Sequence, residues 1–133
     1  MTSVAEHLAA HAADGVCHLQ TTGRASGRPR TIEIWFAVDG TRMYLLAGGR
    51  DSAHWVRNLR ADPAVRVRVG GRTLDGTART VEGEASDPVA RRLLAAKYQR
   101  WREGEPLSSW AAGSLPVEIE LAEGTRPMRP SGQ

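Results

Sequence analysis

The pattern of hydrophobic and polar positions predicts a mainly β chain. Apolar and polar residues alternate with the period of a half-buried strand at residues 16–22, 30–38, 41–47, 65–69, 73–82 and 117–121. Asp39-Gly40, between the second and third of these runs, favours a two-residue hairpin turn. We therefore expect about six short antiparallel strands.

A period near 3.6 residues predicts short helices at residues 2–13, 52–61 and 87–102. Ser3 and Glu6 have the spacing of a capping box, and Asp87-Pro88 suits a helix start. Residues 104–113 are predicted to be a loop.

These elements together indicate an α+β, mainly β fold: a small antiparallel barrel with helical additions. We expect one domain over residues 1–124 and a disordered tail over 125–133, whose sequence TRPMRPSGQ has no core pattern. A dinucleotide-binding βαβ unit is not expected, because no GxGxxG loop follows a strand.

The composition and charge argue against several classes of protein. Hydrophobic residues make up 41% and charged residues 25% of 133, which is ordinary for a globular domain. No apolar run approaches the ~20 residues that span a bilayer, and the N-terminus lacks the pattern of a secretory signal. With Cys17 as the single cysteine, a reducing cytoplasm is the expected location. The net charge is +3, but the arginines are spread along the chain, so nucleic-acid binding is not expected.

Two features indicate a site for an anion. Arg24, Arg28 and Arg30 place three guanidinium groups on one predicted loop, and guanidinium matches phosphate oxygens bidentately. Gly48-Gly49-Arg50-Asp51-Ser52 is expected to offer free backbone amides at a helix start. The alternative is that the arginine loop is only a solvated turn.

Other chemistries have weaker support. His7 and His11 are spaced i, i+4, but no partner ligands suggest a metal site, so none is expected. Cys17 lies in a predicted strand, where a buried and inert thiol is expected. Arg66 and Arg68 are expected to form surface ion pairs with the strand that carries Glu118 and Glu120. Tyr98, Trp101 and Trp110 either complete the core or line a planar ligand.

The motifs TTGR-x-SGRPR and W-x-x-NLRADP-x-V-x-V-x-VGG, with the hairpin and glycine-rich turn between them, resemble the deazaflavin-dependent nitroreductase family. The resemblance covers residues 19–83 and returns at residues 110–121. It implies a split β-barrel akin to pyridoxamine-phosphate oxidases, with coenzyme F420 as cofactor. The residues that the resemblance assigns to cofactor binding are Arg24, Arg28, Pro29, Arg30, Ile32, Glu33, Ile34, Trp35, Gly48, Gly49, Arg50, Ser52, Trp55 and Asn58.

Ala25 stands where the family often has lysine, and Glu33 where it usually has proline. Both changes weaken the case for a polyanionic cofactor tail, so flavin mononucleotide (FMN) is the alternative cofactor. A third possibility is a non-enzymatic protein that binds a hydrophobic or tetrapyrrole ligand.

The implied activity is hydride transfer from reduced deazaflavin to an electron-poor small molecule such as a quinone, enone or nitro compound. Tyr98, Trp101 and Trp110 would line the substrate side, with Tyr98, Ser52 or water as the proton donor. The resemblance also implies a homodimer. Glu33, Trp35 and Ala37 are expected to share an exposed strand face that a second copy could cover.

Overall fold

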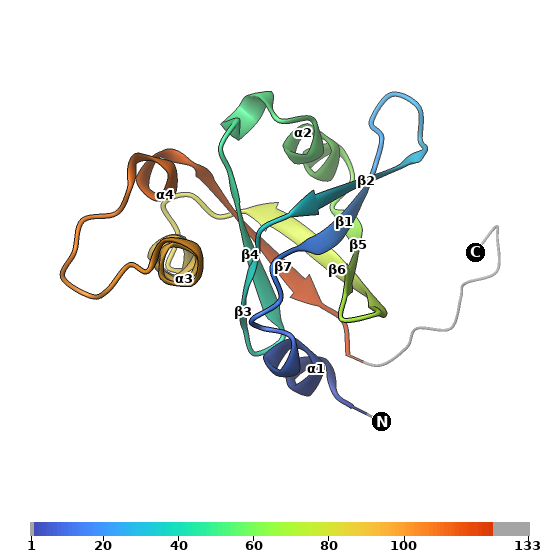
Figure 1. Ribbon diagram of the computed structural model, residues 1–133. Helices are drawn as coiled ribbons and strands as arrows, with labels where there is room; N and C mark the ends of the chain where they lie inside the picture. Colours follow the sequence, from blue (N-terminus) through green and yellow to red (C-terminus); the bar gives the residue numbers. More distant parts are fainter. Residues whose placement is uncertain (1, 124–133) are drawn as a thin grey trace.

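A single antiparallel sheet of seven strands forms the framework of the computed structural model, which describes residues 2–123 (Figure 1). The strands are β1 (Cys17–Thr22), β2 (Pro29–Ile34), β3 (Ala37–Asp39), β4 (Arg42–Ala47), β5 (Ala64–Val69), β6 (Arg72–Thr80) and β7 (Leu115–Leu121). Their order across the curled sheet is β2-β1-β5-β6-β7-β4-β3. The helices are α1 (Val4–Ala10), the 3-10 helix η1 (Arg50–Ser52), α2 (His54–Ala61), α3 (Ser86–Gln99) and α4 (Ser109–Gly113).

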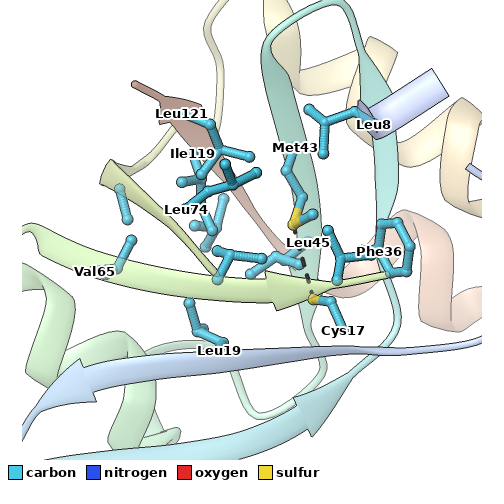
Figure 2. Packing of buried hydrophobic residues seen from close by; sticks show 14 of the residues in the cluster. Leu8, Cys17, Leu19, Phe36, Met43, Leu45, Val65, Leu74, Ile119 and Leu121 are labelled. Carbon is cyan, nitrogen blue, oxygen red and sulfur yellow. Dashed lines mark hydrogen bonds between the residues drawn. The ribbon is translucent and has the colours of Figure 1, made fainter. Parts of the chain in front are cut away.

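The core fills the inside of this curl, as the alternation of apolar residues predicts. In β5, Val65, Val67 and Val69 are buried while the residues between them are exposed. Figure 2 shows the same cluster around the sulfur atoms of Cys17 and Met43, which lie 3.8 Å apart. Cys17 is fully buried, as expected, and burial raises the pKa of its thiol to about 12.

The expected single strand over residues 30–38 is wrong. The chain leaves the sheet at Trp35 and Phe36, so that β2 and β3 lie on opposite edges of the sheet. The reason is tertiary: the Phe36 amide donates to the Tyr98 hydroxyl at 3.0 Å, and Lys97 donates to the Phe36 carbonyl at 2.9 Å. The last turn of α3 thus takes the hydrogen bonds that would have continued the strand.

The Asp39-Gly40 hairpin is confirmed, although only β3 pairs with β4. Gly40 has a φ of +63°, a conformation that glycine adopts without steric cost. The capping box of Ser3 and Glu6 at the start of α1 is also confirmed.

Several other boundaries differ from expectation. The third helix ends at Gln99 rather than near residue 102, because Arg100 adopts a left-handed conformation with a φ of +57°. The expected loop at 104–113 contains α4, whose first turn is capped by the Ser108 side chain. The tail expected to be disordered lies outside the described residues.

The expected pairing of Arg66 and Arg68 with the last strand is also wrong, because the neighbours of β5 in the sheet are β1 and β6, not β7. Arg66 instead pairs with Asp75 at 3.1 Å. Glu118 is buried rather than exposed.

The helices pack against different strands of the sheet (Figure 1). Helix α2 contacts β1 and the start of the β1–β2 loop, while α3 and α4 pack together beside β4. Within residues 2–123, none of the helices is long and apolar enough to span a membrane.

Candidate functional site

A cleft of about 900 Å³ lies between the β1–β2 loop and helix α2. It is lined by Thr21, Gly23, Arg24, Ala25, Ser26, Pro29, Arg30, Thr31, Ile32, Ala53, His54, Trp55 and Asn58. Residues 24–30, which run from the arginine loop into β2, and helix α2 are 24 or more residues apart in the sequence, yet they form two walls of one site.

Asn58 ties the two walls together. Its side-chain oxygen accepts hydrogen bonds from the backbone amide of Arg24 at 3.2 Å and from the Arg24 guanidinium at 2.7 Å. Its amide group donates to the Thr21 hydroxyl at 3.2 Å. One turn earlier on α2, the ring nitrogen Nδ1 of His54 lies 3.1 Å from Arg24 Nη2. Arg24 is thus fixed by α2.

Gly23 allows the loop to fold back on itself. Its amide donates to the Arg28 carbonyl at 2.7 Å, and its carbonyl accepts from the Gly27 amide at 2.8 Å. A Cβ at this position would come within 2.8 Å of the Ser26 hydroxyl and 3.4 Å of Arg30 Nε. A side chain at position 23 would therefore displace the turn and crowd Arg30.

The charge of the cleft is positive. Arg24 and Arg30 line it, and the lining, which lies entirely within residues 2–123, contains no acidic side chain. Over the same described range, neither Arg28 nor Arg30 has a carboxylate within 4.0 Å. Arg28 is exposed on the loop outside the lining. Glu33 comes directly after Ile32, the last residue of β2 that lines the cleft, and its Oε2 atom lies 3.3 Å from His18 Nε2.

Three aromatic rings form a second feature where β2 ends. Trp35 stacks on Tyr98 with ring centroids 4.3 Å apart, and the Trp110 ring meets Trp35 edge-on at 5.4 Å. A Cβ on Gly48 would lie 3.8 Å from the Trp110 ring, so this turn packs directly against the indole. Trp35 is 45% exposed, which leaves part of an aromatic surface open to solvent. We call Trp35, Tyr98 and Trp110 the aromatic trio.

The hydroxyl of Tyr98 is engaged by the backbone. It accepts from the Phe36 amide and lies 2.9 Å from the Gly15 carbonyl, to which it can donate. Burial raises the pKa of Tyr98, so the hydroxyl stays protonated at neutral pH. Trp101 lies just beyond α3, where its indole donates to the Glu105 carbonyl at 2.8 Å.

The turn from Gly48 to Ser52 differs from the expected anion site. The amides of Ser52 and Ala53 donate to the carbonyls of Gly49 and Arg50 in the 3-10 helix, so they are not free for a ligand. The Arg50 guanidinium donates to Glu82 and to the Gly113 carbonyl rather than facing the arginine loop. Ser52 is exposed on this turn.

The structure thus divides the residues expected to bind a cofactor into two groups. Those that line the cleft are Arg24, Pro29, Arg30, Ile32, Trp55 and Asn58. Those outside its lining are Arg28, Glu33, Ile34, Trp35, Gly48, Gly49, Arg50 and Ser52. Sequence reasoning missed His54, although its i, i+4 spacing with Asn58 places both on one face of α2.

Comparison with known proteins identifies the family. The model of the F420H(2)-dependent quinone reductase family matches residues 4–121. An F420H(2)-dependent quinone reductase of Mycobacterium tuberculosis (strain H37Rv) is 35% identical over 72 residues, which are 52% of this chain and 48% of that protein. The match therefore spans about half the length of the curated relatives.

Two solved structures have the same fold. One, described as an F420-H2 dependent reductase, is 27% identical with a TM-score of 0.60, over 82% of this chain and 95% of the other. The second, described as a domain-swapped dimer, is 26% identical with a TM-score of 0.60, over 82% and 81% of the two chains. The curled seven-stranded sheet is thus the expected split β-barrel, and the chain belongs to the F420H(2)-dependent quinone reductase family.

Proposed function

We propose that this protein is an F420-dependent oxidoreductase that reduces an electron-poor small molecule. The observation that carries the proposal is the cleft between the arginine loop and α2, which has two arginines and no acidic residue in a lining formed wholly by described residues. The family match over residues 4–121 supports the same cofactor.

The residues of the cleft fit a phosphorylated, ring-containing cofactor. Its volume of about 900 Å³ is within the range of small-molecule sites, roughly 300–1,000 Å³. Arg30, with the exposed Arg28 on the adjoining loop, would bind the phosphate and the acidic tail, because guanidinium forms charge-assisted bonds with both. Arg24 would add charge in a fixed position, since Asn58 and His54 already hold it.

The apolar part of the cleft would hold the ring system. Pro29, Ile32 and Trp55 supply that surface. Trp35, three residues after Ile32, lies against Trp110, which packs on Gly48. When bound, reduced F420 supplies the hydride. The protein then has to orient both reactants and limit the access of water.

The aromatic trio is the proposed binding surface for the acceptor. Its exposed part, at Trp35, suits a flat and electron-poor molecule such as a quinone, enone or nitro compound. The backbone bonds of the Tyr98 hydroxyl suit a positioning role for that residue. Ser52 or a water molecule is the proposed proton donor.

The test is a fluorescence-quenching titration with F420, followed by turnover of reduced F420 with menadione, a small quinone. We expect binding in the micromolar range and oxidation of the deazaflavin that depends on the protein. A protein that does not bind F420 at tens of micromolar contradicts the proposal.

FMN is the alternative cofactor, and the observation that favours it is Ala25. This residue lines the cleft, where the lysine common in the family would add a charge for a longer acidic tail. A yellow protein that releases flavin on heating, and does not bind F420, would support this alternative.

A homodimer is the proposed assembly. The two large hydrophobic side chains exposed among the described residues, Val16 and Trp35, lie near the open edge of β2. A relative of similar fold is described as a domain-swapped dimer. We also propose a cytoplasmic location, which rests on the single, buried Cys17.

A further inference from the structure

The C-terminal end of α4 is held by two arginines that share one carboxylate. Arg91 on α3 has its Nη1 atom 2.8–2.9 Å from the carbonyl oxygens of Ala111, Ala112 and Ser114, which share its two N–H donors. Arg50 donates to the carbonyl between them, that of Gly113, at 2.7 Å. Four consecutive carbonyls are therefore bound by guanidinium groups.

Glu82 joins the two arginines. Both of its carboxylate oxygens accept from Arg50 at 2.6 Å, and Arg91 lies 3.7 Å away. Asp87 holds Arg91 from the other side, one helical turn earlier on α3. The Arg91 side chain is only 11% exposed. We call Arg50, Glu82 and Arg91 the α4 clamp.

This arrangement is more than a surface ion pair. The last carbonyls of a helix have no partners within the helix and carry partial negative charge, so cations stabilise them. An isolated exposed pair would contribute little, but Arg91 is mostly buried and makes three carbonyl contacts. The clamp therefore fixes where α4 ends.

The position of α4 determines the position of Trp110. This residue is the second of the helix, and its own carbonyl accepts from the amide and the hydroxyl of Ser114. Its ring packs against Gly48 on one side and meets the edge of Trp35 on another. Arg50 is two residues after Gly48, and its side chain binds the end of α4. The clamp therefore links the turn that contains Gly48 to the helix that contains Trp110.

We propose that Arg50, Glu82 and Arg91 are positioning residues that hold Trp110 against the Gly48 turn and thereby control acceptor binding at the aromatic trio. The effect on acceptor binding rests on the proposed function. The position of Trp110 concerns the protein alone. Arg50 then acts through Trp110 and makes no contact with cofactor phosphate.

The first experiment tests the position of Trp110 without any ligand. The protein is labelled with 5-fluorotryptophan, and the fluorine resonance of Trp110 is assigned by its loss in Trp110→Phe. In Arg50→Ala and in Glu82→Ala the Trp110 resonance is expected to shift or broaden more than that of Trp55, which lies on α2. Arg50 is 37% exposed, so its removal is not expected to unfold the chain.

The matched control is Arg66→Ala. Arg66 also pairs with an exposed carboxylate, that of Asp75 at 3.1 Å, and it lies on β5, which is not a neighbour of β4 in the sheet. Its removal is expected to leave all four tryptophan resonances unchanged. A Trp110 resonance that is equally unmoved in Arg50→Ala and in Arg66→Ala would overturn the clamp.

The second experiment separates the acceptor from the cofactor. In Arg50→Ala we expect the KM for menadione to rise about threefold to tenfold, with the Kd for F420 within about twofold of the parent. An Arg50→Ala protein that loses F420 affinity while retaining its menadione KM would overturn the proposal, because Arg50 would then be a cofactor ligand. A parent protein that binds no F420 contradicts the proposed function, but the fluorine result on the clamp still stands.

Discussion

Arg24, Arg30 and Arg50 have identical side chains but three different surroundings. Arg24 is fixed by Asn58 and His54, Arg50 is bound to Glu82, and Arg30 faces the cleft with no carboxylate partner within the described range. The loop motif placed Arg24 and Arg30 near one another, as the lining of the cleft has them, but it did not predict that Asn58 and His54 hold Arg24. Arg50 was not predictable, because its partner is 32 residues away and no periodic pattern connects them.

The surroundings of Asp87 change its pKa, and this leads to a test of its contribution to stability. Burial acts to raise its pKa, but the Gly83 amide and the Arg91 guanidinium outweigh it, so the pKa of Asp87 lies below its ordinary value of 3.8. A lowered pKa in the folded state means that Asp87 stabilises the fold above the unfolded pKa and stops doing so as pH falls through the folded one.

We therefore expect Asp87→Asn to lower the free energy of unfolding by about 1.5 kcal/mol near neutral pH, since asparagine keeps one acceptor but loses the charge. The difference from the parent should close as the pH falls below 3.8. Melting curves of both proteins across this range measure it. A difference that is the same at pH 7 and in strong acid would mean that the charge of Asp87 does not stabilise the fold.

Among the elements, the region between β2 and β3 shows what alternation cannot predict. The residues from 30 to 38 alternate as one strand would, yet the strand is interrupted at Phe36, whose amide donates to the Tyr98 hydroxyl and whose carbonyl accepts from Lys97. This break moves the chain from one edge of the sheet to the other and turns Trp35 onto Tyr98. Local pattern predicts that a strand exists, while long-range partners decide where it stops.

The open edge of β2 also determines the prediction for assembly. The face expected from Glu33, Trp35 and Ala37 does not exist as one surface, because Ala37 is buried beyond the break. The exposed Val16 and the open edge of β2 remain for a second copy to cover. We expect sedimentation at micromolar concentration to show a dimer, and Val16→Ser to shift it toward monomer. A parent that sediments as a monomer alone rules out the homodimer.

For the whole molecule, the fold could be predicted better than the site. Alternation and turn signals predict most strands and the core, because burial of one sheet face leaves a period of two in the sequence. The cleft depends on which loop meets which helix, and alternation does not predict that contact; the family resemblance indicated it by naming Asn58, which bonds to Arg24. The central proposal is that the arginine loop and α2 together bind the cofactor.

The most direct measurement of that claim compares the Kd for F420 of Arg30→Ala with that of Arg66→Ala. Charge-assisted bonds contribute on the order of 1.5–3 kcal/mol, and ~1.4 kcal/mol is a factor of ten in affinity. Arg66 faces solvent on β5 and pairs with Asp75, so it serves as the matched control. We expect Arg30→Ala to bind F420 roughly tenfold to a hundredfold more weakly, Arg28→Ala to lose less affinity, and Arg66→Ala to bind like the parent. The stability of all three variants is expected to stay within about 0.5 kcal/mol of the parent, as is usual for surface substitutions. Equal affinities of Arg30→Ala and Arg66→Ala would show that the arginine loop is only a solvated turn.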